Sequence, residues 1–402
     1  MKKPIKKTIL IIEPEISGHH LEYLKLVVNT LVCNYNVVIG TLDCHELEIK
    51  KELPDDIVRI VTIKNFLYVK ERGLSLLSIA YEQFLELSLY KKIFQKAIKH
   101  NAIDHIFIMY IDLVVSSLAL SWRPFGGVEY SGISMNTWTP NIYKSKNYTI
   151  NIKSFIKEWQ FKFFLNNSKL KKILHIDNVL VKSIKPHYLF KNKILYLPDP
   201  ILNYTECCKF NKYKYKYNIG NDVVTILVSG AITNRKNILP LAQEIVAKNL
   251  KKITLLILGE GVKANLCKMT KSYLRILENR GQLIVRDERI SEKDLHAAYC
   301  ASDWVWAAYK NHIGSSSVFF HSVAYGKPVI VSEFTNSGYY ATILNSGLLI
   351  RKDFSNLAEV ISKYVGIQNS FSVPVESSYK IINEHSVDRF SRIISKTLVE
   401  LV

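Results

Sequence analysis

The sequence predicts an α/β protein of two domains, each built on a parallel, doubly wound sheet. Its 402 residues are more than one ordinary hydrophobic core organises. Short apolar segments alternate with amphipathic segments of helical spacing, in one series before residue 195 and in a second after residue 222. Between the two series lies "LYLPDPI", residues 195–201, whose two prolines interrupt helices and strand ladders alike. We therefore expect a domain boundary near residue 198.

The first series begins with an apolar strand over 8–14, a loop over 15–20 and a helix over 21–33. Helices are also expected over 74–100 and 152–170. Apolar and β-branched runs predict the remaining strands of this half, at 35–43, 58–63, 105–110, 127–134 and 178–183.

The second series repeats the alternation with shorter connections. Apolar runs predict its strands, at 223–230, 253–261, 282–287, 303–309, 327–333 and 347–350. Helical spacing predicts the helices between them, at 239–250, 264–281, 291–302 and 316–326. Ligands of open parallel sheets sit outside the carboxyl ends of the strands, so the loops that follow the strands are where we look for function.

Composition limits the possible partners and the location of the chain. The net charge of +19 predicts attraction to anions such as nucleotides, nucleic acid or an acidic membrane face. No RNA-binding signature or zinc-finger spacing accompanies the charge, so no nucleic-acid partner is expected. The six cysteines form no CxxC pair, which predicts no disulfide framework and no zinc site and favours a reducing compartment. The apolar run at 8–12 is too short for a signal-peptide core, and no run of about 18 apolar residues predicts a membrane span. We expect a cytoplasmic protein, with peripheral contact at the inner membrane as a further expectation.

The loop "SGAITNRKN" places two adjacent cations, Arg235 and Lys236, between a strand and a helix. Gly230 lets the backbone bend there or approach a ligand closely. Cations at a helix N-terminus oppose the helix dipole, so they are unfavourable unless an anion binds. A diphosphate would supply that anion. The alternative is a solvated basic turn in a lysine-rich chain.

Three later strand ends carry similar features. "LGEG" ends one strand with Gly259, Glu260 and Gly261, and "DERIS" follows the next strand with Arg289. A third loop holds residues that are able to cap a helix and offer hydroxyl and N–H groups to phosphate: Gly314, Ser315, Ser316 and Ser317. Each loop has a plain structural alternative, a tight turn or a cap, and it is their ordered series that points to one binding site.

The first half offers fewer candidates. Gly18, His19 and His20 follow the first strand, where imidazole groups are suited to contact an acceptor or a phosphate near neutral pH. The alternative is that Ser17 caps the helix and both histidines are exposed. Asp112 lies near a strand end, as a catalytic carboxylate or as a structural cap.

Four segments in order, "SGAITNRKN", "LILGEG", "LHAAYCASDWVW" and "GSSSVFFHSVAYGKPVI", resemble the donor domain of GT-B glycosyltransferases of the retaining family 4, or group 1, type. The first half resembles the family in outline only. The resemblance implies two Rossmann-like domains with parallel sheets facing a central cleft. It implies an acceptor-binding domain over 1–198, a nucleotide-sugar donor-binding domain over 199–375, and a final helix over 376–402 that crosses back. In the family the loop arginine and lysine hold the donor diphosphate, a role that falls here to Arg235 and Lys236.

One departure from the family concerns two glutamates eight residues apart, which face the sugar and the ribose. Their places hold Ile313 and His321 here. His321 remains able to hydrogen-bond a ribose, whereas Ile313 offers a sugar nothing. Asn311 and His312 are the candidates to replace it.

The resemblance implies a metal-independent hexosyltransferase, with a nucleotide-sugar as substrate and no cofactor. The expected acceptor is a glycan or lipid-linked glycan in bacterial surface polysaccharide biosynthesis: lipopolysaccharide O-antigen, capsule or exopolysaccharide. Arg235, Lys236 and Asp112 are its candidate catalytic residues. Two alternatives stay open, a nucleotide-sugar epimerase on the same fold and a non-catalytic glycosyltransferase-like subunit. Two basic aromatic segments, 155–174 and 209–217, are expected either to rest on an anionic membrane or to pack within their domains.

Overall fold

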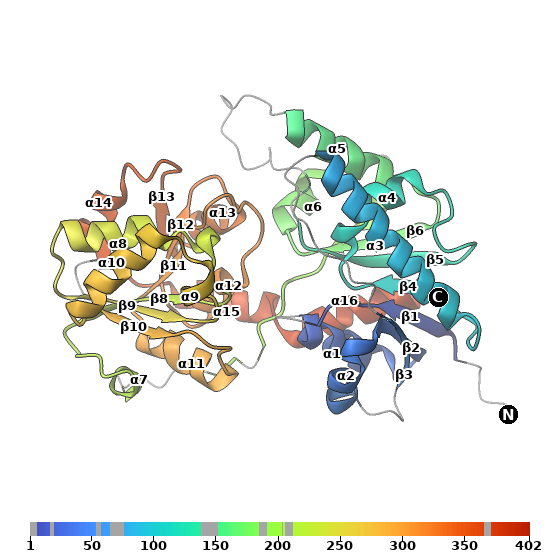
Figure 1. Cartoon of the computed structure of the whole chain (residues 1–402), viewed down its shortest axis with the longest axis horizontal. Coiled ribbons are helices and arrows are strands. Elements are labelled where there is room, and N and C mark those ends of the chain that lie inside the picture. Colours follow the sequence, from blue (N-terminus) through green and yellow to red (C-terminus); the bar gives the residue numbers. More distant parts are fainter. Residues whose placement is uncertain are drawn as a thin grey trace. The chain divides into compact units, whose positions relative to one another are not determined.

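The computed structural model describes residues 6–16, 20–53, 58–64, 76–136, 138, 152–184, 191–202, 204–205, 212–365 and 371–402. The chain divides into two compact units (Figure 1): Met1–Pro198 together with Val387–Val402, and Asp199–Ser386. Each unit contains one parallel sheet with helices on both faces. The two Rossmann-like units that the alternation predicts are confirmed.

The first unit has a seven-stranded sheet in the order β3-β2-β1-β4-β5-β6-β7, and all of its neighbouring strands run parallel. Its strands are β1 (Thr8–Ile12), β2 (Asn36–Leu42), β3 (Val58–Ile63), β4 (His105–Ile108), β5 (Glu129–Ser134), β6 (Leu170–His175) and β7 (Ile194–Tyr196). The strand order reverses between β1 and β4, so the chain leaves these two strands toward opposite sides of the sheet.

Helices cover both faces of this sheet. One apolar core lies under α3 (Leu76–Ala97), α4 (Val115–Leu120), α5 (Ile152–Leu165) and α6 (Asn178–Ile184). The other core lies under α1 (His20–Leu31), α2 (Glu46–Glu52) and α16 (Val387–Val399). Short 3₁₀ turns complete the unit: η1 (Asp43–His45), η2 (Ile111–Leu113) and η4 (Lys191–Lys193).

The second unit has a six-stranded parallel sheet in the order β10-β9-β8-β11-β12-β13. Its strands are β8 (Val224–Ser229), β9 (Ile253–Leu258), β10 (Leu283–Arg286), β11 (Trp304–Ala307), β12 (Val329–Ser332) and β13 (Gly347–Ile350). Here the strand order reverses between β8 and β11. Leu255, Leu256 and Ile257 of β9 are fully buried, which explains the unbroken apolar run of that strand.

The helices of the second unit follow the strands with short connections. They are α7 (Lys212–Lys216), η5 (Asn234–Lys236), α8 (Ile238–Ala247), α9 (Val262–Asn265), α10 (Lys268–Asn279), α11 (Glu292–Ala301), α12 (Ser317–Ala324), α13 (Asn336–Ile343), α14 (Leu357–Val360) and α15 (Val375–Glu384). A π-helical turn, Ile361–Val365, follows α14. Helices α8, α10 and α14 pack on one core of this sheet.

Three segments differ from the sequence prediction. Residues 178–183 form helix α6 and not a strand, because the Asp177 carboxylate accepts the Leu180 N–H at 3.1 Å and starts a helix. The strand that lies beside β5 is instead β6, which overlaps the end of the predicted helix 152–170. Helix α13 between β12 and β13 was not predicted, and it begins with a cap in which Thr335 accepts the Gly338 N–H.

The last part of the chain belongs to both units. Helix α15 packs against α12 in the second unit, and α16 packs against α1 in the first. The chain therefore rejoins the first unit at Val387.

The cysteines depart from expectation at one position. Cys300 is disulfide-bonded, whereas the thiols of Cys33, Cys44 and Cys267 are free. The cysteines therefore give no argument for a reducing compartment. Among the helices described above, none is both long enough and apolar enough to span a bilayer.

His105, the first residue of β4, links the stability of the first unit to pH. Its side chain is 1% exposed. Burial lowers the pKa of the imidazole to about 4, with nearby Glu129 raising it and Lys171 lowering it. An unfolded histidine titrates near 6.5, so between these values the unfolded chain binds a proton that the folded chain does not. Folding stability therefore falls as the pH drops from about 6.5 to about 4.

We expect the variant His105→Phe to lose this part of the acid sensitivity. Between pH 6.5 and 4 the wild-type protein should lose about 3 kcal/mol more unfolding free energy than the variant. Urea unfolding at four pH values measures this, with His100→Gln, an exposed histidine, as the control. Parallel pH profiles for His105→Phe and wild type would contradict the assignment.

Candidate functional site

The candidate residues of the second unit gather where its strand order reverses. β8 ends at Ser229 and its neighbour β11 ends at Ala307, and these two carboxyl ends form the switch point of the sheet. The loops that leave them run to opposite faces, which opens a crevice for ligands in sheets of this kind.

Lys236 lies at this switch point with its charge buried. Its side chain is 3% exposed, and its ammonium donates to the Ser229 carbonyl at 2.5 Å and to the Tyr309 hydroxyl at 3.0 Å. The ammonium also lies 4.5 Å from the centre of the Tyr309 ring, a cation–π distance. Among the described residues no carboxylate lies within salt-bridge distance of it. A buried cation without an anion is costly, so this arrangement favours a ligand that brings negative charge.

Arg235 is the exposed member of the pair. Its guanidinium lies 5.6 Å from the Tyr309 ring centre and 3.4 Å from His312 Nδ1. Burial, and then the positive charge of Arg235, lower the pKa of His312 to about 4, so that imidazole is neutral at pH 7. The imidazole Nε2 lies 3.0 Å from the Ser315 carbonyl oxygen. Because His312 is neutral, it adds no third positive charge beside Arg235 and Lys236. The two cations therefore remain able to bind an anion.

Backbone contacts to the segment after β11 fix the cationic loop. The Trp306 indole N–H donates to the Lys236 carbonyl at 2.9 Å, and the Lys310 N–H donates to the Arg235 carbonyl at 2.8 Å. The two loops of the switch point are therefore tied together, and both cations are preorganised. The two cations differ in exposure, since Lys236 is held inside the unit and Arg235 reaches solvent.

The glycines of the next loop meet the cationic loop backbone to backbone. A Cβ on Gly259, which has φ +139°, would lie 2.0 Å from the Gly230 carbonyl oxygen. A Cβ on Gly261, at φ +111°, would lie 2.3 Å from the Ile232 carbonyl oxygen. The packing of the two loops thus requires glycine at both positions, whether or not a ligand also approaches. Glu260, between them, is exposed.

Asp287, after β10, neutralises one helix end. Its carboxylate accepts the N–H groups of Gly261, Val262 and Lys263 at 2.7, 3.0 and 2.9 Å. These hydrogen bonds, the one from Lys263 first, lower the pKa of Asp287. The start of α9 therefore already has its anion. Arg289, two residues further on, is exposed.

The start of α12 has no such neutralising group. Ser316 is the N-cap residue, but its side chain makes no capping hydrogen bond. Gly314, Ser315 and Ser316 are buried and Ser317 is exposed. The Ser315 hydroxyl has no hydrogen-bond partner in the described part of the chain. This helix end keeps the N–H groups and dipole that favour an anion.

The two positions that depart from the family glutamates have different surroundings. His321, in the middle of α12, has Nδ1 2.8 Å from the Ser317 carbonyl oxygen and stacks on Tyr299 at 6.1 Å. Burial lowers the pKa of His321, which keeps it neutral at pH 7. Ile313 is half-buried, and its carbonyl accepts the Asn336 N–H at 2.8 Å. Neither position carries a charge.

In the first unit, His20 lies at the corresponding switch point, between β1 and β4. Its Nδ1 is 3.0 Å from the carboxylate of Glu13, which directly follows β1, and its ring meets Tyr110 edge-on at 5.6 Å. Glu13 is 2% exposed, and burial raises its pKa while the hydrogen bond to His20 opposes the rise. Gly18 and His19 lie outside the described residues. Sequence reasoning missed Glu13, although an acid directly after an apolar strand was the available signal.

Asp112 is fully engaged in structural contacts. It is 3% exposed and accepts from the Ser134 hydroxyl at 2.7 Å, the Trp138 indole at 2.6 Å, and the N–H groups of Met135 and Asn136. Burial raises its pKa and these donors lower it. The contacts favour the structural alternative, a carboxylate that holds the end of β5.

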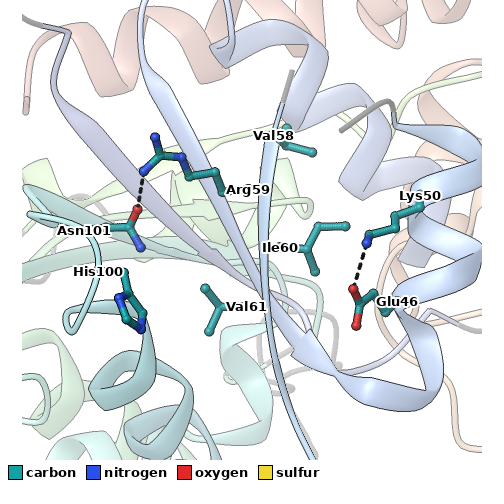
Figure 2. A pocket seen from close by; sticks show the side chains of 8 residues that line it. All are labelled: Glu46, Lys50, Val58, Arg59, Ile60, Val61, His100 and Asn101. Atoms are coloured by element: carbon teal, nitrogen blue, oxygen red, sulfur yellow. Dashed lines mark hydrogen bonds and ion pairs between the residues drawn. The ribbon is translucent and has the colours of Figure 1, made fainter. Parts of the chain in front are cut away.

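Two hollows among the described residues lie away from the switch points. Figure 2 shows one of about 410 Å³ beside edge strand β3, where Arg59 donates to Asn101 and Lys50 pairs with Glu46. A second, of about 440 Å³, lies at the amino ends of β9 and β10. No candidate residue lines either hollow, and the loops that follow the strands line neither of them. We therefore place the candidate site at the switch points.

Part of the chain matches a known protein family. Residues 223–366 match the family model described as "Glycosyl transferases group 1". A search among curated proteins finds no match.

Solved structures match nearly the whole chain. Sucrose-phosphate synthase from Thermosynechococcus elongatus has a TM-score of 0.71 at 13% identity, covering 98% of this chain and 99% of its own. Anabaena HepE in complex with UDP has 0.64 at 12%, covering 98% and 100%. WaaG, a glycosyltransferase involved in lipopolysaccharide biosynthesis, has 0.63 at 12%, covering 96% and 99%. The similar structures also include a UDP-N-acetylglucosamine 2-epimerase, at 0.58 and 12%, covering 99% and 96%. The fold is therefore GT-B, as the sequence predicts.

The contact between the glycine loops yields a stability prediction. Gly259→Ala forces a Cβ into the Gly230 carbonyl at a strained φ, so we expect a loss of about 3 kcal/mol or more of unfolding free energy. Denaturant unfolding measures it. Gly127→Ala is the control, because a Cβ there meets nothing within 4 Å. Equal midpoints for the two variants would refute the close contact.

Proposed function

We propose that the protein is a glycosyltransferase that binds a nucleotide-sugar at the switch point of its second unit. One observation carries the proposal: Arg235 and Lys236 converge on Tyr309 at the carboxyl ends of β8 and β11, with no carboxylate within salt-bridge distance of either in the described chain. The match of this segment to the group 1 glycosyl transferases and the UDP bound by a similar structure support it.

The proposed chemistry is sugar transfer with a nucleoside diphosphate as the leaving group. The bond between the sugar anomeric carbon and the diphosphate oxygen breaks, and a bond to an acceptor hydroxyl oxygen forms. Negative charge then grows on the diphosphate, and preorganised cations stabilise such charge most effectively. Arg235, Lys236 and the start of α12 supply the positive potential, so we propose a transfer that needs no metal.

On the acceptor side, His20 with Glu13 is the proposed contact. A carboxylate at Nδ1 fixes the orientation of the imidazole and stabilises its protonated form, the arrangement that general-base histidines use. Asp112 keeps a positioning role only. Whether the sugar is transferred with retention follows the family resemblance and stays a proposal.

The wider role rests on analogy. We propose a glycan or lipid-linked glycan as the acceptor, in bacterial surface polysaccharide biosynthesis at the cytoplasmic side of the membrane. WaaG, a structure similar over the whole chain, is involved in lipopolysaccharide biosynthesis. Fold-level analogy is weaker than the site argument.

Two alternatives each have one observation in their favour. A nucleotide-sugar epimerase is favoured by the similarity to the UDP-N-acetylglucosamine 2-epimerase structure. A non-catalytic subunit is favoured by Ile313 and His321 at the places of the family glutamates. Incubation with UDP-sugars and candidate acceptors separates the three functions. A glycosyltransferase yields a new glycoside and UDP, an epimerase yields an epimerised UDP-sugar without any acceptor, and a non-catalytic subunit yields no product.

The donor site predicts a specific thermal response. UDP at about 100 times its Kd should raise the melting temperature of the wild-type protein by about 5 °C. Arg235→Ala should weaken UDP binding about tenfold or more, since it removes a charge-assisted hydrogen bond. Lys236→Met should abolish the shift while the ligand-free melting temperature stays equal or rises, because the buried cation is lost. Lys251→Ala, an exposed lysine before β9, is the control. If UDP raised the melting temperature of both site variants as much as that of the wild type, the diphosphate would bind away from Arg235 and Lys236.

The acceptor side predicts a different kinetic signature. His20→Gln should lower kcat about a hundredfold or more while UDP binding is unchanged, because the histidine acts on the acceptor and not on the donor. Glu13→Gln should lower kcat less and shift its pH profile. Isothermal titration with UDP and transfer rates with a labelled UDP-sugar check both. Loss of UDP binding in His20→Gln would contradict the division of roles.

A further inference from the structure

We infer that the outer face of helices α3, α4 and α5 in the first unit docks on an anionic lipid bilayer. The inference rests on surface features of the first unit and is independent of the proposed activity.

Helix α5 is apolar on two sides. Phe161, Phe164 and Leu165 are buried in the core under the helix. Phe155, Trp159 and Phe163 recur every four residues on another face and are 61%, 51% and 44% exposed. The rings of Trp159 and Phe163 lie 4.2 Å apart, so they form one continuous ridge. A helix that is apolar on its exposed side as well as its buried side needs a second apolar environment.

The neighbouring helices also have exposed apolar side chains. Helix α4 contacts both α3 and α5, and the three form one layer over the same core. On α3, Tyr81 and Phe84 are each 63% exposed, one helical turn apart. At the end of α4, Leu120 is 87% exposed and Trp122 is 79% exposed. Of the chain's five tryptophans, the two that are exposed both belong to this layer.

The charged side chains of this face indicate which partner it binds. Helix α5 has exposed cations beside its aromatic ridge, one of which, Lys162, pairs with Glu158 at 3.2 Å. Lys157 and Lys162 of α5 and Arg123 beside Trp122 are exposed. Tryptophan and tyrosine prefer the interface of a bilayer, and lysine and arginine bind its anionic headgroups. A second copy of this face would bring two like charges together, so an anionic bilayer is the favoured occupant.

The other basic aromatic segment, residues 209–217, has one largely exposed aromatic side chain in its described part, Tyr215 at 67%, and no ridge of them. Lys214 is 2% exposed and pairs with Asp303 at 2.9 Å, and Lys216 pairs with Asp294 at 2.6 Å. The Tyr217 hydroxyl donates to the Asp294 carbonyl. These lysines are used inside the second unit, which favours the packing alternative for that segment. Basic and aromatic composition alone therefore does not define the docking face, whereas exposure does.

Vesicle binding of the full-length protein tests the inference. We expect cosedimentation with phosphatidylglycerol-containing vesicles, weak binding to pure phosphatidylcholine vesicles, and a decrease with salt. Phe155→Ser/Trp159→Ser should weaken binding about tenfold or more. Lys157→Gln/Lys162→Gln should weaken binding to anionic vesicles and flatten the salt dependence. Leu47→Ser/Val399→Ser, which removes apolar side chains that are 75% and 58% exposed and lie outside this layer, should bind as the wild type does.

Fluorescence gives a second readout that does not depend on how well a polar variant folds. Anionic vesicles should shift tryptophan emission to the blue, and Trp122→Phe/Trp159→Phe should remove the shift while keeping the affinity. Two results would overturn the inference: wild-type protein that stays in the supernatant at low salt, or unchanged binding in Phe155→Ser/Trp159→Ser. A dimer in light scattering that Trp159→Ser dissociates would assign the face to self-association instead. UDP binding and sugar transfer in solution are unaffected by any of these outcomes, so the proposed function stands or falls separately.

Discussion

The electrostatic potential of the proposed site in the second unit depends on one buried charge, that of Lys236. The Lys236 ammonium is held by the Ser229 carbonyl and the Tyr309 hydroxyl, which belong to the two strand ends where the sheet order reverses. The backbone around it is tied to β11 through Trp306 and Lys310. A positive charge in so little solvent is stabilised by dipoles and an aromatic face alone, which leaves a strong potential at the crevice. The glycine contacts and the open start of α12 lie in loops that border this position.

The two units have the same sheet architecture but place different side chains at their switch points. Both have parallel sheets with a reversal of strand order, and both place a titratable group just beyond the first strand. In the second unit the groups are cations without carboxylate neighbours. In the first unit a buried carboxylate, Glu13, faces a histidine, His20. Asp112 and Asp287 lie at strand ends as well, but they are saturated by N–H and O–H donors and act as fixed parts of the scaffold. Asp112 and Asp287 each accept three or more of these bonds, whereas Glu13 accepts from the Glu15 N–H and lies beside the titratable side chain of His20.

Much of the fold was predictable from sequence because the second half alternates strongly between apolar runs and helical spacing. The wrong predictions fall on segments whose local sequence pattern indicated one structure while contacts with other residues determined another. Residues 178–183 have the composition of a strand, but the preceding Asp177 caps a helix there. Lys171 and Lys172 obscure the apolar pattern of β6, because both are half-buried with their ammonium groups engaged by Glu129 and by the Asn192 carbonyl. The position of Arg235 and Lys236 at a strand end was predictable, whereas the burial of Lys236 was not, because its partner Tyr309 lies 73 residues away. Glu13 was not predicted because its role depends on the position of His20. The fold brings His20 beside Glu13 after a loop, and no local sequence pattern indicates this contact.

The path of the chain has a consequence for how the protein matures. The second unit is one unbroken stretch, Asp199–Ser386, whereas the first is assembled from the two extremes of the sequence. Phe390, Ile394 and Leu398 of α16 are fully buried in a core shared with α1. During synthesis, domains commonly fold in order as they leave the ribosome. Here the first unit stays incomplete until α16 emerges, and the apolar surface of α1 that includes Tyr23, whose ring meets Phe390 at 5.5 Å, stays uncovered until then. A nascent chain halted before α16 would therefore expose that surface, and chaperones would be expected to engage it there.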